Sequence, residues 1–459
     1  MIKAGAFFSF IALLFILSGC GTIPDMHALL HDRSLYHSRS EIVGPDGELT
    51  DEQSRRIISR LEQHQQTPSD ILDRHLAFEQ ALSNVPLVLG NKVSLLENGA
   101  ATYQAMLAAI RTAKDSINMQ TYTFTDGPVG QMFADALIER QSHGVQVNLE
   151  YDSLGSFGTP RTFFERLQQN GVAVLEYRPV NPFAAKLPWS FSHRNHRKML
   201  VVDGRVAFTG GINISEVYAS GPSGSKEKGP SEYWRDTDIE VEGPAVAEFQ
   251  RSFIDEWKYQ QGQALSPRDY FPTLDQKGNQ IVRVIFSVPE RFSLIYVTWV
   301  SAVASSQTNI YITDAYFAPD RQVLHALEHA ARRGVDVRLL LPSQTDEPLI
   351  LAAQHSHYAD LLEAGVKIYE WQGQMLHAKT TTIDGVWSTV GTSNLDWWSI
   401  ARDNELNAII LSHSFGDDMN LMFRNDIENS VQIDQEQWKN RGFLERVHET
   451  AARIIEPLL

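Results

Sequence analysis

The sequence predicts an α/β protein in which one layered lobe occurs twice. From residue 86 onward, segments with helical and strand periodicity alternate, paired segments of the two halves share one pattern, and each half carries the same polar motif. The chain has 459 residues, which allows about two or three domains. A hydrophobic fraction of 43% and a charged fraction of 21% are typical of a globular protein with buried cores.

The N-terminal residues predict an export signal. A basic start and the apolar run 6–17 lead through small residues to Cys20, and the run is shorter than the ~20 residues that span a membrane. The ending "LSGC" resembles the lipobox of bacterial lipoproteins, which implies removal of residues 1–19 and lipidation of Cys20. Gly21 favours the outer membrane over the inner one. The alternative is an uncleaved anchor, and both interpretations hold the protein on a bacterial membrane, facing the periplasm.

Residues 20–85 predict a polar, mostly helical spacer, in which Thr50 and Gln53 form a capping box before a helix. Two lobes are expected to follow, over residues 86–270 and 271–459. Each lobe is predicted to contain a helix, a strand, a second helix and further strands, in that order.

The predicted elements of the two halves correspond in order. A helical pattern at Tyr103, Leu107 and Ile110 precedes a strand at Ile117, Met119 and Thr121, and the second half repeats this at Tyr296, Val300 and Val303, then at Ile310, Ile312 and Asp314. "ALIERQSHGVQVNLEYDS" then corresponds to "ALEHAARRGVDVRLLLPS". Gly144 and Gly334 in these segments are predicted helix C-caps.

Each half contains His-x-Lys-x-x-x-x-Asp followed by an Asn at the same interval. The members are His196, Lys198, Asp203 and Asn213 with Ser215 in the first half, and His377, Lys379, Asp384 and Asn394 with Thr392 in the second. His and Lys two residues apart on a strand point to one face. Two such sets offer two Lys and two Asn as a clamp for a phosphate whose charge rises in the transition state.

Two imidazoles then divide the remaining chemistry. One attacks phosphorus and forms a phosphohistidine, and the other protonates the leaving alkoxide and later deprotonates the acceptor. No metal or other cofactor is expected, because Lys and Asn supply the charge stabilisation and the paired Lys would repel a cation. A net charge of −16 disfavours nucleic acid as a partner, since such binders usually carry a basic excess.

The doubled motif resembles the paired HKD signature of the phospholipase D superfamily, and "PLVLGNKVSLLENG", "YWRDTDIEVEGPAV" and "STVGTSNLD" resemble its bacterial cardiolipin synthase branch. The resemblance implies two α/β/α sandwich lobes related by a pseudo-twofold axis with one shared active site. It also implies that His196 is the nucleophile and His377 the acid/base. The other motif members, Lys198, Asp203, Lys379 and Asp384, are expected to act in the chemistry with them. Asp236 and Glu405 would hold the histidines in crossed pairs, Glu405 with His196 and Asp236 with His377.

Two features depart from this pattern. Trp397-Trp398-Ser399 stands where the family often has Arg before Ser, and the double Trp is predicted either to meet lipid or to pack. The Gly-rich stretch 219–232 predicts a flexible loop, and the aromatic and basic stretch 178–196 predicts a loop that meets lipid at the site.

These observations predict an enzyme that transfers a phosphatidyl group between glycerophospholipids, with a membrane and phosphatidylglycerol or a similar lipid as partners and cardiolipin as product. A hydrolase that releases phosphatidic acid is the first alternative. A nuclease or other phosphodiesterase and a lipoprotein that only binds anionic lipid are weaker ones.

Overall fold

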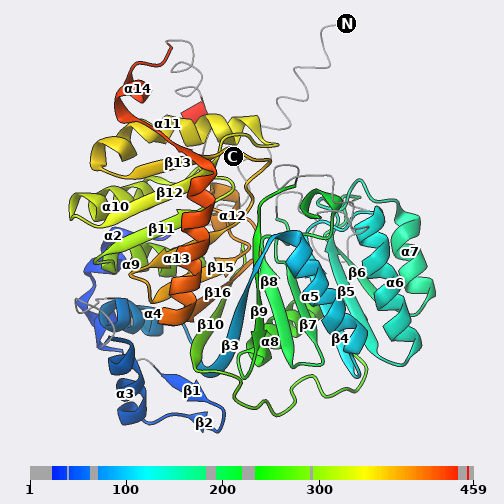
Figure 1. The fold of residues 1–459 in the computed structure, drawn as a ribbon. Helices are drawn as coiled ribbons and strands as arrows, with labels where there is room; N and C mark the ends of the chain where they lie inside the picture. Colours follow the sequence, from blue (N-terminus) through cyan, green and yellow to red (C-terminus); the bar gives the residue numbers. More distant parts are fainter. Residues whose placement is uncertain are drawn as a thin grey trace, which may run out of the picture.

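The computed structural model describes residues 23–38, 41–62, 71–181, 193–219, 233–289, 293–442 and 452–453. The predicted signal peptide, Cys20 and most of both predicted loops, 178–196 and 219–232, lie outside these residues. Two lobes lie side by side, with strand β3 between them (Figure 1). In the described part of the chain, no helix has the length and apolar character needed to cross a membrane.

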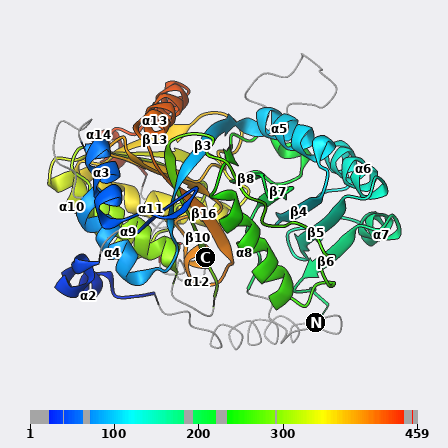
Figure 2. The ribbon, with the colours of Figure 1, turned by 90° about the horizontal axis from the view of Figure 1, so that it is seen from below.

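The first lobe is a mixed sheet with helices on both faces. Its strands lie in the order β6-β5-β4-β7-β8-β9-β3, with parallel pairing from β6 to β4 and antiparallel pairing beyond. Figure 2 shows α8 on one face and α5 and α6 on the other. The elements are β3 (Leu87–Glu97), α5 (Asn98–Thr112), β4 (Ser116–Thr121), α6 (Pro128–Ser142), β5 (Gln146–Asp152), α7 (Arg161–Gln169), β6 (Ala173–Tyr177), β7 (Met199–Val202), β8 (Val206–Gly210), η4 (Glu216–Tyr218), β9 (Thr237–Glu242) and α8 (Val246–Tyr259).

The second lobe repeats this order as β13-β12-β11-β14-β15-β16-β10, with β17 added at the edge beside β13. The predicted duplication is therefore confirmed strand for strand. The elements are β10 (Gln280–Ser287), α9 (Leu294–Ser305), β11 (Asn309–Thr313), α10 (Arg321–Arg332), β12 (Asp336–Pro342), α11 (Pro348–Ala364), β13 (Lys367–Trp371), β14 (Thr380–Ile383), β15 (Trp387–Gly391), α12 (Trp397–Ala401), β16 (Glu405–Leu411), α13 (His413–Glu428), β17 (Ser430–Gln432) and α14 (Gln435–Lys439).

Local predictions for both lobes are also confirmed. Gly144 and Gly334 follow the ends of α6 and α10 with positive φ angles of 86° and 95°, as helix C-caps require. The short strands β7 and β14, which follow the two His-x-Lys pairs, are buried along their whole length.

The two sheets are joined through β3. Its first half pairs antiparallel with β10 of the second lobe, and its second half pairs antiparallel with β9 of the first. A single strand thus fixes both sheets edge to edge, which is the arrangement that brings equivalent strand ends of the two lobes together.

The N-terminal segment packs on the second lobe. Its elements are α2 (Met26–His31), η1 (Arg33–His37), β1 (Ile42–Gly44), β2 (Gly47–Glu48), α3 (Asp51–Glu62), the π-helical turn η2 (Ile71–His75) and α4 (Leu76–Leu82). Met26, Ile71 and Phe78 share one hydrophobic core with Trp299 and Val300 of α9. The predicted capping box is confirmed, because Gln53 N–H donates to Thr50 Oγ1 and Thr50 N–H donates to Gln53 Oε1.

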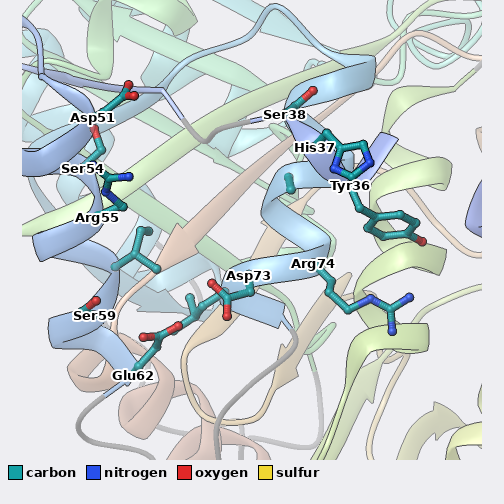
Figure 3. A pocket seen from close by; sticks show the side chains of 13 residues that line it. Tyr36, His37, Ser38, Asp51, Ser54, Arg55, Ser59, Glu62, Asp73 and Arg74 are labelled. Atoms are coloured by element: carbon teal, nitrogen blue, oxygen red, sulfur yellow. The ribbon is translucent and has the colours of Figure 1, made fainter. Parts of the chain in front are cut away.

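A cavity of about 530 Å³ lies inside this N-terminal segment. Figure 3 shows Asp51, Ser54 and Arg55 of α3 on one side of it and Asp73 and Arg74 of η2 on the other. All its lining residues lie between Tyr36 and Ala77. It is therefore separate from the two repeated motifs.

Candidate active site

His196 and His377 line one cavity of about 730 Å³, to which both lobes contribute. Each histidine lies just before the short buried strand of its own lobe. Its backbone is fixed by the other lobe, since His196 N–H donates to Asn404 O at 2.9 Å and His377 N–H donates to Arg235 O at 2.7 Å. These crossed backbone bonds hold the two strand entrances against each other and bring both imidazoles to one space.

The side chains are crossed in the same way. His196 Nδ1 lies 2.9 Å from Glu405 Oε1, and His377 Nδ1 lies 2.7 Å from Asp236 Oδ2. Both contacts that the resemblance implied are thus confirmed. With Nδ1 of each ring engaged, each imidazole keeps Nε2 for the reaction, and the carboxylate fixes its tautomer and orientation.

The two lysines lie next to the histidines and are almost fully buried. Lys198 Nζ donates to His196 O at 2.7 Å, and Lys379 Nζ donates to His377 O at 2.5 Å. Burial lowers the pKa of Lys198 to about 7 and also lowers that of Lys379. Both ammonium groups act on both imidazoles electrostatically, so the positive charges converge where an anionic phosphodiester would bind.

Three of the four predicted phosphate-binding residues line the cavity: Asn213, Ser215 and Asn394. Thr392 does not, because its side chain is fully buried and its hydroxyl donates to Glu405 Oε2. We therefore assign Thr392 to the support of the Glu405 carboxylate.

The structure places the third member of each motif away from the cavity. Asp203 accepts hydrogen bonds from the backbone N–H groups of Lys114, Asp115 and Ser116, and Asp384 accepts them from those of residues 307–309. Each strand carries its Asp to the opposite end, into a turn with φ of 53° or 52°. The expectation that these two aspartates act in the chemistry is corrected: they anchor turns.

Aromatic and acidic residues outside the two motifs also line the cavity, and most of them were not predicted from the sequence. In the part of the chain that the structure describes, the rings that pack against His377 are those of Trp234, Tyr218 and Tyr316, at centroid distances of 5.3, 5.6 and 5.8 Å. Tyr122 packs against His196 at 5.1 Å. Further lining residues are Arg194, Asp346, Glu347, Asp396, Trp398 and Asp403.

A sequence signal existed for two of these residues. Trp234 and Asp403 each stand two positions before the carboxylate that holds a histidine, in "WRD" and "DNE". Since alternate residues of an extended segment share a face, both could have been placed beside the site. Of the two neighbouring tryptophans, Trp398 lines the cavity.

The two histidine–carboxylate pairs differ in their protonation. Burial raises the pKa of Asp236 to about 7 despite the neighbouring Lys379. Burial also acts to raise the pKa of Glu405, but His196, Lys198 and Thr392 together hold it below its usual value. Burial and both lysines lower the pKa of both histidines. The shift is larger in His377, because Glu405 opposes it at His196. Near neutrality, Glu405 is therefore ionised while Asp236 is close to its midpoint.

The protein has two lobes of one fold, and each lobe brings one His–Lys set to a shared cavity. Each His is held by a carboxylate of the other lobe. This arrangement defines a phospholipase D-like protein. The family described as "Cardiolipin synthase, PLD-like domain" matches residues 106–221 and 300–427, which include both motifs. The solved structure of phosphatidylserine synthase from Haemophilus influenzae Rd KW20 has the same fold, with a TM-score of 0.64 at 15% identity over 83% of this chain and 99% of that one.

Two curated relatives extend this match over most of the chain. Cardiolipin synthase of Geobacillus kaustophilus (strain HTA426) is 33% identical over 82% of this chain and 74% of its own length. Cardiolipin synthase A of Pseudomonas aeruginosa (strain LESB58) is 34% identical over 82% of this chain and 75% of its own. The chain belongs to the cardiolipin synthase family of phospholipase D-like proteins.

Proposed function

We propose that this protein transfers a phosphatidyl group from one glycerophospholipid to another through a phosphohistidine, making cardiolipin and glycerol from two molecules of phosphatidylglycerol. The observation that carries the proposal is the crossed pair of imidazoles in one cavity, each held at Nδ1 by a carboxylate of the other lobe. The names of the relatives, cardiolipin synthases, support this choice of product.

In the first step, Nε2 of neutral His196 attacks the phosphorus of the donor lipid. The bond from phosphorus to the headgroup oxygen breaks, and protonated His377 gives its proton to the departing glycerol. The ionised Glu405 supports the attack, because a negative charge at Nδ1 raises the basicity of the ring. The lysine charges stabilise the phosphoryl oxygens as they gain charge.

In the second step, neutral His377 removes the proton from a hydroxyl of a second phosphatidylglycerol. That oxygen attacks phosphorus, the bond from phosphorus to His196 breaks, and cardiolipin is released with both imidazoles restored. Burial and the lysines favour neutral His377 before substrate binds. A bound phosphodiester anion offsets these positive charges and raises the pKa of His377, so the substrate itself favours the acid form needed in the first step.

The test is a product analysis with purified protein and vesicles of labelled phosphatidylglycerol. Cardiolipin with an equal amount of free glycerol is the expected result. Phosphatidic acid as the main product would replace the proposal by hydrolysis, since water would then be the acceptor. Nicking of plasmid DNA without lipid turnover would replace it by a nuclease.

We also propose that the mature chain begins at Cys20 and is held by lipid on the periplasmic side of the outer membrane. The sequence "LSGC" with Gly21 supports this placement. Metabolic labelling with a radioactive fatty acid should mark the protein, and Cys20→Ala should lose the label and leave the membrane fraction. An unlabelled wild-type protein would exclude the lipid anchor.

A further inference from the structure

The cavity wall beside His377 carries aromatic and acidic side chains. Tyr316 packs edge-on against the His377 ring at 5.8 Å and 85°, and its hydroxyl donates to Asp346 Oδ1 at 2.7 Å. Both residues line the cavity, and Asp346 lies exposed at its mouth. Trp234 covers another side of the same ring.

The reaction requires an alcohol on this side. Attacking and leaving groups lie roughly in line across phosphorus, so the alcohol that leaves lies opposite His196 and next to the group that protonates it. The accepting alcohol enters along the same line in reverse. Both alcohols therefore occupy the space beside His377, where Tyr316, Asp346 and Trp234 form the wall.

We propose that Tyr316 and Asp346 form the subsite for the alcohol, and that they select a glycerol unit whose free hydroxyl lies next to the reacting one. This subsite rests on the proposed function, because it assigns the alcohol of that same reaction. The neighbouring hydroxyl donates to the Asp346 carboxylate while the reacting hydroxyl lies against His377.

The geometry favours a headgroup that presents two neighbouring hydroxyls and carries no charge directly beside them. Tyr316 occupies Oδ1 of Asp346, and within the part of the chain that the structure describes nothing donates to Oδ2, which can accept from a ligand. Glu347 lies beside it and also lines the cavity. Two neighbouring carboxylates repel a headgroup that carries its own carboxylate or phosphate next to the reacting oxygen. The ring of Trp234 offers an apolar face for the carbon chain.

Electrostatics independently place Asp346 near the acid/base. The Asp346 carboxylate acts to raise the pKa of His377, against the lysines and His196, which lower it. A glycerol unit with one hydroxyl against the imidazole can therefore direct its neighbouring hydroxyl toward Asp346.

The test measures the choice between two alcohols. Purified enzyme receives phosphatidylglycerol vesicles with equal concentrations of labelled glycerol and 1-propanol, which lacks the neighbouring hydroxyl. Wild-type enzyme should favour glycerol by about tenfold or more, the effect of one hydrogen bond to a charged acceptor. Asp346→Asn should bring the glycerol-to-propanol ratio close to one. Tyr316→Phe, which keeps the ring, should shift the ratio in the same direction and add little to Asp346→Asn.

The controls separate recognition from structure. Asp360→Asn changes an exposed carboxylate of α11 that pairs with Arg453, and it should leave the ratio unchanged. If Asp346 only fastens α11, Asp346→Asn would lower transfer to both alcohols equally, and the subsite is wrong. If wild-type enzyme transfers the phosphatidyl group to neither alcohol nor to a second lipid, the proposed function itself fails.

Discussion

His196 and His377 occupy equivalent positions in two lobes of the same topology, yet their surroundings differ. Glu405 beside His196 is held ionised, whereas the pKa of Asp236 beside His377 is raised to about 7. Among the described residues, one aromatic ring packs against His196 and three pack against His377. The duplication gives both imidazoles the same geometry, and the environment then divides their work.

One position accounts for part of this difference. Thr392 at the end of β15 donates to Glu405, while the equivalent residue at the end of β8 is Gly211. A Cβ atom on Gly211 would lie 2.2 Å from Asp236 Oδ1. The first lobe therefore has no room beside Asp236 for a hydroxyl like that of Thr392, which stabilises the ionised Glu405 in the second lobe. Without such a donor, Asp236 keeps its proton to a higher pH.

The largest expected effect concerns the histidines themselves. His196→Ala removes the proposed nucleophile, and we expect a loss of at least ~10⁴-fold in kcat. His377→Ala removes the acid/base, and a loss of about 10²- to 10⁴-fold is expected for lipid substrates. With a ³²P-labelled phosphodiester that has a good leaving group, His377→Ala should accumulate labelled protein, because release from His196 then lacks its base.

The same labelling experiment can also contradict the roles assigned to the two histidines. Label trapped on His196→Ala but not on His377→Ala would reverse the assigned roles. His355→Ala is the control, since His355 also pairs with a carboxylate, that of Glu370 at 3.0 Å, and neither residue lines the cavity. It should turn over and release label like the wild type.

Neutralising Glu405 should lower kcat about ten times more than neutralising Asp236. Glu405→Gln replaces an ionised group and should lower kcat by about 10³-fold, whereas Asp236→Asn replaces a group already half protonated and should cost about 10²-fold. Steady-state rates on mixed vesicles measure both, with Glu370→Gln as the unaffected control. Equal losses would mean that the two pairs have the same protonation during turnover.

The two motifs were predictable from their identical spacing in the two halves, and the crossed pairs were implied by the resemblance to the phospholipase D superfamily. The roles of individual members were not. Asp203 and Asp384 belong to the motif by sequence, but the length of the strand after each Lys carries them to the opposite end of the sheet. Tyr316 and Asp346 lie in separate loops, after β11 and after β12, and only the tertiary fold brings them to the side of the cavity next to His377. Thr392 was predicted to bind phosphate, but its hydroxyl donates to Glu405 of β16, a contact that the sequence alone does not show.

The pH profile of kcat/KM tests whether Lys198 or the pair of Asp236 and His377 causes the loss of activity at alkaline pH. Lys198 has its pKa lowered to about 7, so it loses its charge as the pH rises, and the pair of Asp236 and His377 loses its shared proton in the same range. We expect kcat/KM, which reports the free enzyme, to fall about tenfold per pH unit above roughly pH 7. Lys198→Arg keeps its charge, so a shift of this limb to higher pH would assign it to Lys198. An unchanged limb would assign it to the pair beside His377.

The smallest expected effect concerns Thr392. Thr392→Val keeps the shape and removes the hydroxyl that donates to Glu405, so kcat should fall about fivefold, as for one hydrogen bond of about 1 kcal/mol. The same change raises the pKa of Glu405, since that bond helps to lower it, and the acidic limb of kcat/KM should move to higher pH. Thr392→Ser should restore both values. Thr382→Val, in the buried strand β14, is the matched control and should leave the profile unchanged. If Thr392→Val lowered the rate without moving the acidic limb, Thr392 would only pack against the strand, and the difference between the two carboxylates would have to arise from the lysines and aromatic rings instead.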